Sequence, residues 1–241
     1  MDDLASLSSA EIADEGDLVL DYVEPQDTDY DEIYQILVEN SFYEDLLSNL
    51  NETYALPTDV FVSFDECGEE NAFYDSENVT ITICYELIKT YADSAHAEYQ
   101  DDYAQEVIYA GFFTFFHELG HALVDQYQLP VVGREEDAVD AFAAVLMLQA
   151  EEENAVIAGM EQFDLDAVYE AEQDELPFWD EHSLSEQRVY NVSCLIYGSD
   201  PEGYADFIES GWLPEERADG CEAEYEQAAY SWDTLLAPYL N

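Results

Sequence analysis

Basic side chains are nearly absent from this sequence. Only 4 of its 241 residues are Lys or Arg, against 59 Asp or Glu, so the formal net charge at pH 7 is -55. A surface of this charge repels nucleic acid and anionic lipid, and we expect neither as a partner. Such acidity is typical of a high-salt habitat or of a surface recharged for solubility, and composition does not separate the two origins.

Long apolar runs are lacking as well. No stretch approaches the roughly 18 apolar residues of a membrane span, and the N-terminus has no basic start followed by an apolar core. We therefore expect no membrane span and no signal peptide in this chain. The length and the 48% hydrophobic content suit one core. We expect an acidic disordered leader over residues 1–28 and a single domain over residues 29–241.

Cysteine is scarce, and its spacing excludes the C-x-x-C pattern of zinc and redox motifs. The four cysteines are Cys67, Cys84, Cys194 and Cys221, which fall as two pairs near in sequence. This spacing favours two local disulfides, although three pairings are possible and four reduced core cysteines are the alternative. With disulfides, we expect a secreted or periplasmic protein whose signal peptide is absent from this chain.

The periodicity of apolar residues predicts an α+β fold. Helical spacing begins near Tyr30 and ends near Pro57, and three short strand patterns follow at 60–64, 71–75 and 79–86. Helical patterns then run over roughly 85–99, 102–128, 135–157, 161–175, 184–198 and the C-terminal segment. We expect a small antiparallel sheet packed on a mainly helical body.

The segment GFFTFFHELGHALVDQY carries the strongest functional signal. His117 and His121 are four residues apart, so both imidazoles project from one face of a helix and can hold one zinc ion. Glu118 lies between them, where its carboxylate can act as the catalytic base toward a metal-activated water. The other interpretation is two histidines that are merely satisfied in a core.

A third protein ligand is expected on the following helix, which begins GREEDAVDAF. We favour Glu136 over Glu135, because Asp140 lies one turn after Glu136 and can orient a ligand histidine. Asp125, one turn after His121, is another candidate for such a contact. Arg134 can neutralise part of this acidic cluster or form an inconsequential surface ion pair.

HELGHALVDQY followed by EDAVD resembles the gluzincin branch of the zincin metallopeptidases, the thermolysin-like pattern H-E-x-x-H then E-x-x-x-D. The NAFYD segment is similar to the strand that lines the substrate cleft in that branch. The resemblance implies that Asn71 and the backbone of Ala72 hold an extended peptide. Tyr74, beside them, can also contact substrate.

A closer resemblance covers the chain from about residue 30 to its end. ECGEENAFYD, ITICYEL, LPVVGREEDA and SWDTLLAPYL are similar to a bacterial family of proposed metallopeptidases known mainly as a domain of unknown function. Downstream, His182 and Arg188 in DEHSLSEQR look like the His and Arg pair of the membrane-embedded prenyl-protein peptidases, without the proline after the histidine. That likeness implies catalytic roles for both residues, with oxyanion stabilisation by His182. Helix capping or a core polar contact is the alternative.

These features predict a zinc-dependent peptide hydrolase with one Zn2+ per chain, acting on a peptide or protein substrate. A catalytically inactive, zinc-stabilised binding or scaffold protein is the second hypothesis. A cation sponge is the third, and the absence of an EF-hand loop counts against it. The pattern indicates neither the cleavage preference nor the oligomeric state.

Overall fold

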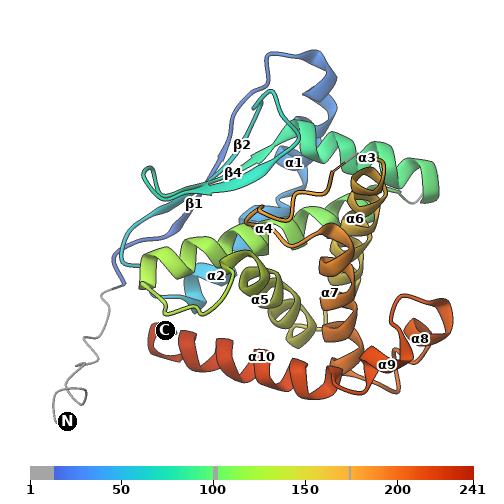
Figure 1. Ribbon diagram of the computed structural model, residues 1–241. Coiled ribbons are helices and arrows are strands. Elements are labelled where there is room, and N and C mark those ends of the chain that lie inside the picture. Colours follow the sequence, from blue (N-terminus) through green and yellow to red (C-terminus); the bar gives the residue numbers. More distant parts are fainter. Residues whose placement is uncertain (1–13, 100–102, 174) are drawn as a thin grey trace, which may run out of the picture.

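The chain folds into a small sheet that lies against a body of helices (Figure 1). The computed structural model describes residues 14–99, 103–173 and 175–241. The strands are β1 (Leu18–Tyr22), β2 (Val60–Asp65), β3 (Ala72–Asp75) and β4 (Thr80–Cys84). The helices are α1 (Asp31–Asn40), α2 (Phe42–Thr53), α3 (Tyr85–Tyr99), α4 (Tyr103–Tyr127), α5 (Glu135–Gln149), α6 (Glu153–Ala171), α7 (Ser185–Ser199), α8 (Asp206–Ser210), α9 (Glu215–Ala218) and α10 (Cys221–Leu236). The predicted α+β class is confirmed.

The sheet is mixed and has the strand order β1-β2-β4-β3. β1 runs parallel to β2, and β2 runs parallel to β4 with Val62 opposite Ile81. β3 is antiparallel to β4, with Tyr74 also opposite Ile81. Alternate residues of β2 and β4 are buried in the core, including Val62 and Ile83. β3 therefore forms one edge of a sheet whose inner face packs on the helices.

Two expectations about this region are wrong. We expected an antiparallel sheet and a disordered leader over residues 1–28, but β1 lies within that leader and pairs in parallel with β2. The chain passes from β1 to β2 through α1 and α2, and so long a crossover permits a parallel neighbour. Leu18 is buried in the core, which holds this short strand in place. The leader before residue 14 lies outside the described residues.

α4 is the central helix of the body (Figure 1). It packs against β3 and β4 on one side and against α3, α5 and α6 on the others. Its apolar residues point in all directions, as expected for a helix surrounded by protein. Within the described ranges, α4 is the one helix long and apolar enough to cross a membrane. Its most apolar 18-residue stretch is 61% buried inside the fold.

The break between two predicted helices lies earlier than expected. The patterns over 135–157 and 161–175 predicted a break near residues 158–160, but α5 ends at Gln149 and α6 begins at Glu153 and runs on to Ala171. Glu151, between them, adopts a positive φ of 62°. The turn lets α6 pack against both α4 and α7. No glycine or proline stands at this turn, so composition did not signal it.

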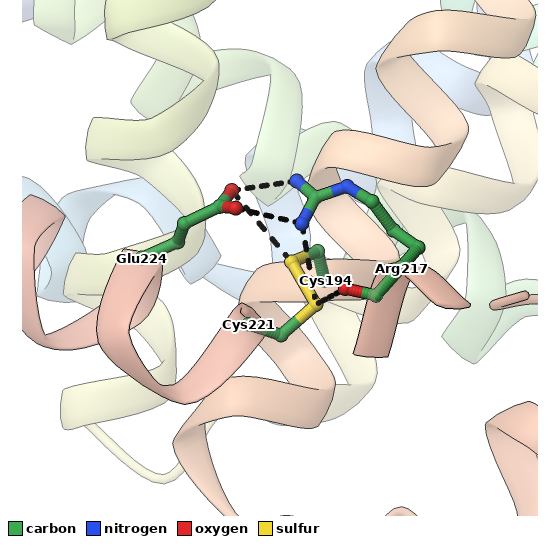
Figure 2. The surroundings of a disulfide bond; sticks show 4 residues. All are labelled: Cys194, Arg217, Cys221 and Glu224. Carbon is green, nitrogen blue, oxygen red and sulfur yellow. Dashed lines mark hydrogen bonds and ion pairs between the residues drawn. A yellow bond between two sulfur atoms is a disulfide. The ribbon is translucent and has the colours of Figure 1, made fainter. Parts of the chain in front are cut away.

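Two disulfides join neighbouring elements, which confirms the preferred interpretation of the cysteines. Cys67–Cys84 connects the segment after β2 to the end of β4, and Cys194–Cys221 connects α7 to the start of α10. Figure 2 shows the second bond beside an ion pair in which Arg217 donates to both carboxylate oxygens of Glu224, at 2.7 and 2.6 Å. Two such bonds indicate an oxidising, extracellular-type environment.

Candidate metal centre

Three side chains of α4 meet at the floor of a cleft. His117, Glu118 and His121 all line this cleft, which has a volume of about 1010 Å³. Because residues one turn apart share a helix face, the two imidazole centroids lie 5.1 Å apart. His117 and Glu118 are buried, and His121 is partly buried. Further lining comes from β3 and its flanking residues, from the segment that joins α4 to α5, from the start of α5 and from residues 180–182.

The first turn of α5 places a carboxylate between the two histidines. Glu136 Oε2 lies 3.2 Å from His117 Nε2, and Glu136 Oε1 lies 3.3 Å from His121 Nε2. Glu135, the competing candidate for the third ligand, takes the other ring nitrogen of His121 and lies 2.8 Å from Nδ1. The two glutamates thus occupy different positions, and Glu136 is the one that faces both Nε2 atoms.

Close packing of α4 on α5 brings Glu136 to this place. Gly120 lies at the crossing of the two helices and has no side chain to separate them. A Cβ atom at this position would lie 2.8 Å from Val139 Cβ and 3.0 Å from Phe142 Cδ1, closer than packed atoms tolerate. The glycine within H-E-L-G-H is therefore needed for the approach of α5.

A third histidine approaches the same carboxylate from the segment before α7. His182 Nε2 lies 3.1 Å from Glu136 Oε2. Asp180 Oδ1 accepts a hydrogen bond from the backbone N–H of His182 at 2.9 Å and lies 3.1 Å from its Nδ1. Arg134 donates to the carbonyl oxygen of His182 at 2.9 Å. Sequence reasoning missed Asp180, whose one signal is its position two residues before His182.

Asp140 holds His117 from the side opposite Glu136. Its Oδ1 atom lies 2.8 Å from His117 Nδ1. Arg188 donates to both oxygens of Asp140 at 2.7 Å, and its guanidinium carbon lies 3.8 Å from the centroid of the Phe163 ring. Arg188 does not line the cleft. These contacts favour a positioning role for Arg188 over the catalytic role that we expected.

The predicted substrate-binding residues, which lie in β3 and directly before it, line the cleft. Asn71 Oδ1 accepts a hydrogen bond from the backbone N–H of Ala72 at 3.0 Å. The Tyr74 hydroxyl donates to Asp125 Oδ2 at 2.8 Å. The expectation that Asp125 orients a ligand histidine is not met, because its carboxylate is engaged by β3 while Glu135 holds His121.

The electrostatics around Glu136 favour positive charge. Burial opposes protonation of His117, but its hydrogen bond to Asp140 and the nearby Glu136 carboxylate outweigh that effect and raise its pKa to about 9. Burial likewise opposes ionisation of Glu136, yet contacts with His117, His121 and His182 hold the pKa of its carboxyl well below the usual range. Groups with these preferences suit a bound cation.

Glu136 also has the surroundings of a metal ligand. Its Oε2 atom is buried and has no partner with hydrogen-bond geometry, although the Nε2 atoms of His117 and His182 lie 3.2 and 3.1 Å away. The candidate ligand atoms of these three residues all lie within 4.8 Å of one another. Imidazole nitrogens and carboxylates are the donors that zinc and related ions take. The residues present therefore fit a divalent cation.

Fold and site together define an α+β protein with a cluster of candidate metal ligands at the floor of a cleft. The chain belongs to the family described as "Putative metallopeptidase", whose model matches residues 22–236. No curated protein and no solved structure matches the chain. Membership of this family supports a metal and a peptidase activity for the chain.

Proposed function

We propose that this chain is a zinc-dependent peptide hydrolase of the gluzincin type, in which His117, His121 and Glu136 hold one Zn2+. The position of the Glu136 carboxylate carries this proposal, because its two oxygens face the Nε2 atoms of both histidines of the H-E-x-x-H segment. A zinc ion supplies a Lewis acid that polarises a peptide carbonyl and lowers the pKa of water.

Glu118 is the general base of this proposal. It lines the cleft beside His117, and its side chain is buried. Burial raises the pKa of its carboxyl, toward the range in which one group can both accept and return a proton. Glu118 accepts a proton from the attacking water and passes it to the nitrogen of the leaving amine, so that the peptide bond breaks without a net change at the carboxylate.

Carboxylates fix the orientation of the two histidines on α4. A hydrogen bond from Nδ1 of His117 to Asp140, or from Nδ1 of His121 to Glu135, leaves the Nε2 lone pair directed at the centre. Arg188 compensates the buried charge of Asp140. Arg188 is thus a positioning residue that acts on the centre through Asp140 and His117.

The free edge of β3 is suited to an extended peptide. The backbone N–H of Cys84 donates to the carbonyl of Asn71, which makes Ala72 and Ile83 a pair without mutual hydrogen bonds. The N–H and C=O of Ala72 therefore point away from β4, toward the cleft. A substrate strand can add to this edge in place of the Asn71 side chain.

The net charge of the molecule indicates which peptides it prefers, and its disulfides indicate where it acts. A net charge of -55 favours basic peptides over acidic ones at low salt. The two disulfides support a secreted or periplasmic location.

A substitution at the base tests the proposal. Glu118→Gln keeps the size of the side chain but removes its basicity, so hydrolysis of a peptide library should fall about 10²–10⁴-fold. About one zinc per chain should remain after dialysis, measured by elemental analysis. Glu106→Gln, the same change three turns earlier on α4, should leave the rate unchanged. Parent-like cleavage by Glu118→Gln would show that the base is another group.

A second candidate is a zinc-stabilised binding or scaffold protein. The approach of His182 to Glu136 favours it, since four protein groups around one ion are typical of structural zinc. This candidate predicts zinc-dependent folding without turnover of any peptide by the parent. Incubating the zinc-loaded parent with the library separates the two functions, because cleavage above that of Glu118→Gln excludes the scaffold.

A further inference from the structure

The three histidines around Glu136 share one arrangement. Each directs Nε2 at the Glu136 carboxylate, at 3.2, 3.3 and 3.1 Å for His117, His121 and His182. Each also places Nδ1 against a carboxylate of its own. These pairs are His117–Asp140, His121–Glu135 and His182–Asp180, at 2.8, 2.8 and 3.1 Å. A carboxylate on the outer nitrogen is the usual support of a metal-ligating histidine.

From this shared geometry we infer that His182 is a fourth metal ligand of the centre, an inference that rests on the proposed zinc site. An oxyanion stabiliser must direct an N–H group at the substrate. In His182 the Nδ1 atom lies against Asp180, and Nε2 is directed at Glu136 and the ligand cluster. The contacts of His182 are those of a ligand.

The segment that carries His182 is fastened to the helix that carries Glu136. Arg134, directly before α5, donates to the His182 carbonyl at 2.9 Å. The Ser183 hydroxyl donates to Asp137, in the first turn of α5, at 2.6 Å. Asp180 fixes both the backbone N–H and the ring of His182. These contacts place the imidazole at the centre by several independent bonds.

His182 is also the outermost of the candidate ligands. Its side chain is 44% exposed, whereas those of His117 and Glu136 are 9% and 14% exposed. The first three ligands come from two packed helices, while His182 comes from the segment that precedes α7. Of the four candidate ligands, His182 is therefore the one that a substrate would reach first.

Metal affinity and the spectrum of a cobalt derivative test this inference without reference to turnover. His182→Ala should lower zinc affinity, measured by competition with a chelator. Loss of a residue that only hydrogen-bonds a metal ligand costs about 10- to 100-fold in affinity, and loss of a ligand should cost at least as much. The visible absorption bands of the Co2+-substituted protein should shift. Free imidazole should restore the parent bands, because it can fill the vacated position. His96→Ala, an exposed histidine on α3, is the control and should change neither quantity.

The outcomes separate this inference from the proposed function. If the parent binds zinc and His182→Ala has the same affinity and the same cobalt spectrum, His182 is not a ligand, and the site with three protein ligands stands. If the parent binds no zinc after zinc is supplied, both proposals fail. Circular dichroism of each variant shows whether a loss of affinity reflects loss of the fold, and rescue by imidazole is possible only in a folded protein.

Discussion

Arg188 and Asp140 form a buried ion pair whose two side chains are 14% and 7% exposed. Asp140 carries a pKa lowered to about 2, because the adjacent Arg188 outweighs the opposing effect of burial. A buried carboxylate that loses its partner is costly, by about 3–5 kcal/mol. Arg188→Ala should therefore lower the free energy of unfolding by several kcal/mol, as measured by urea denaturation of the metal-free protein.

An exposed ion pair provides the control for this prediction. Lys89 and Asp93 lie one turn apart on α3 with side chains 40% and 71% exposed, so Lys89→Ala should cost about 0–1 kcal/mol. Equal effects of Arg188→Ala and Lys89→Ala on unfolding would mean that Asp140 is stabilised by other groups. The unfolding curves of both variants should keep the slope of the parent.

Residue-level expectations succeeded where they depended on spacing along one helix. The placement of His117 and His121 on one face follows from a spacing of four residues, and the structure shows it. Asp125 follows the same spacing but contacts Tyr74 of β3, which no local rule predicts. Asp180 lies outside any helix, so its contact with His182 had no periodicity to reveal it.

Gly120 decides how closely two helices approach. An added Cβ would press on Val139 and Phe142 of α5, and such overpacking costs about 1–3 kcal/mol. Gly120→Ala should lower the free energy of unfolding and also weaken zinc binding, because Glu136 moves away together with α5. Urea denaturation and chelator competition measure the two effects.

Gly111, on the same helix, offers a matched control. A Cβ there would meet one side-chain atom, Tyr43 Oη, at 3.1 Å. Replacing a helix-interior glycine with alanine also gains about 1 kcal/mol of helix propensity. Gly111→Ala should leave zinc affinity unchanged and stability close to that of the parent. If Gly111→Ala loses as much zinc affinity as Gly120→Ala, displacement of α5 is not the reason that Gly120→Ala binds zinc more weakly.

At the scale of elements, the sequence predicted the helices better than the sheet. The starts of α5 and α7 followed from the periodicity of apolar residues along the chain. β1 was missed because its five residues stand within an acidic stretch, and its burial depends on the distant β2. The direction of β4 relative to β2 could not be read either, since β4 inserts between β2 and β3.

The whole molecule is dominated by repulsion between carboxylates. All four basic residues already have partners: Lys89 with Asp93, Arg134 with the His182 carbonyl, Arg188 with Asp140 and Arg217 with Glu224. Unfolding spreads the remaining negative charges apart, so the folded state gains when salt screens them. Screening lengths fall from about 10 Å at 0.1 M to about 3 Å at 1 M salt.

Thermal unfolding in sodium chloride should show this dependence. Between about 0.1 and 1 M salt, the midpoint should rise by at least about 2–4 °C. This is the shift that one kcal/mol of added stability produces in a domain of this size. A scan in sucrose at matched osmolality is the control. Sucrose stabilises the fold by solute exclusion but does not screen charge, so a larger rise in sodium chloride is due to screening. A midpoint that stays level or falls with salt would mean that the carboxylates do not limit stability.

The edge position of β3 has a consequence for the protein in solution. A strand edge that can accept a substrate can equally accept the same edge of a second molecule, and such pairing begins aggregation. Phe73, on that strand, is 38% exposed and adds an apolar surface to the edge. Like charges keep the molecules apart at low salt, and screening removes this barrier. The salt that stabilises each folded chain therefore also brings the open edges within reach of one another.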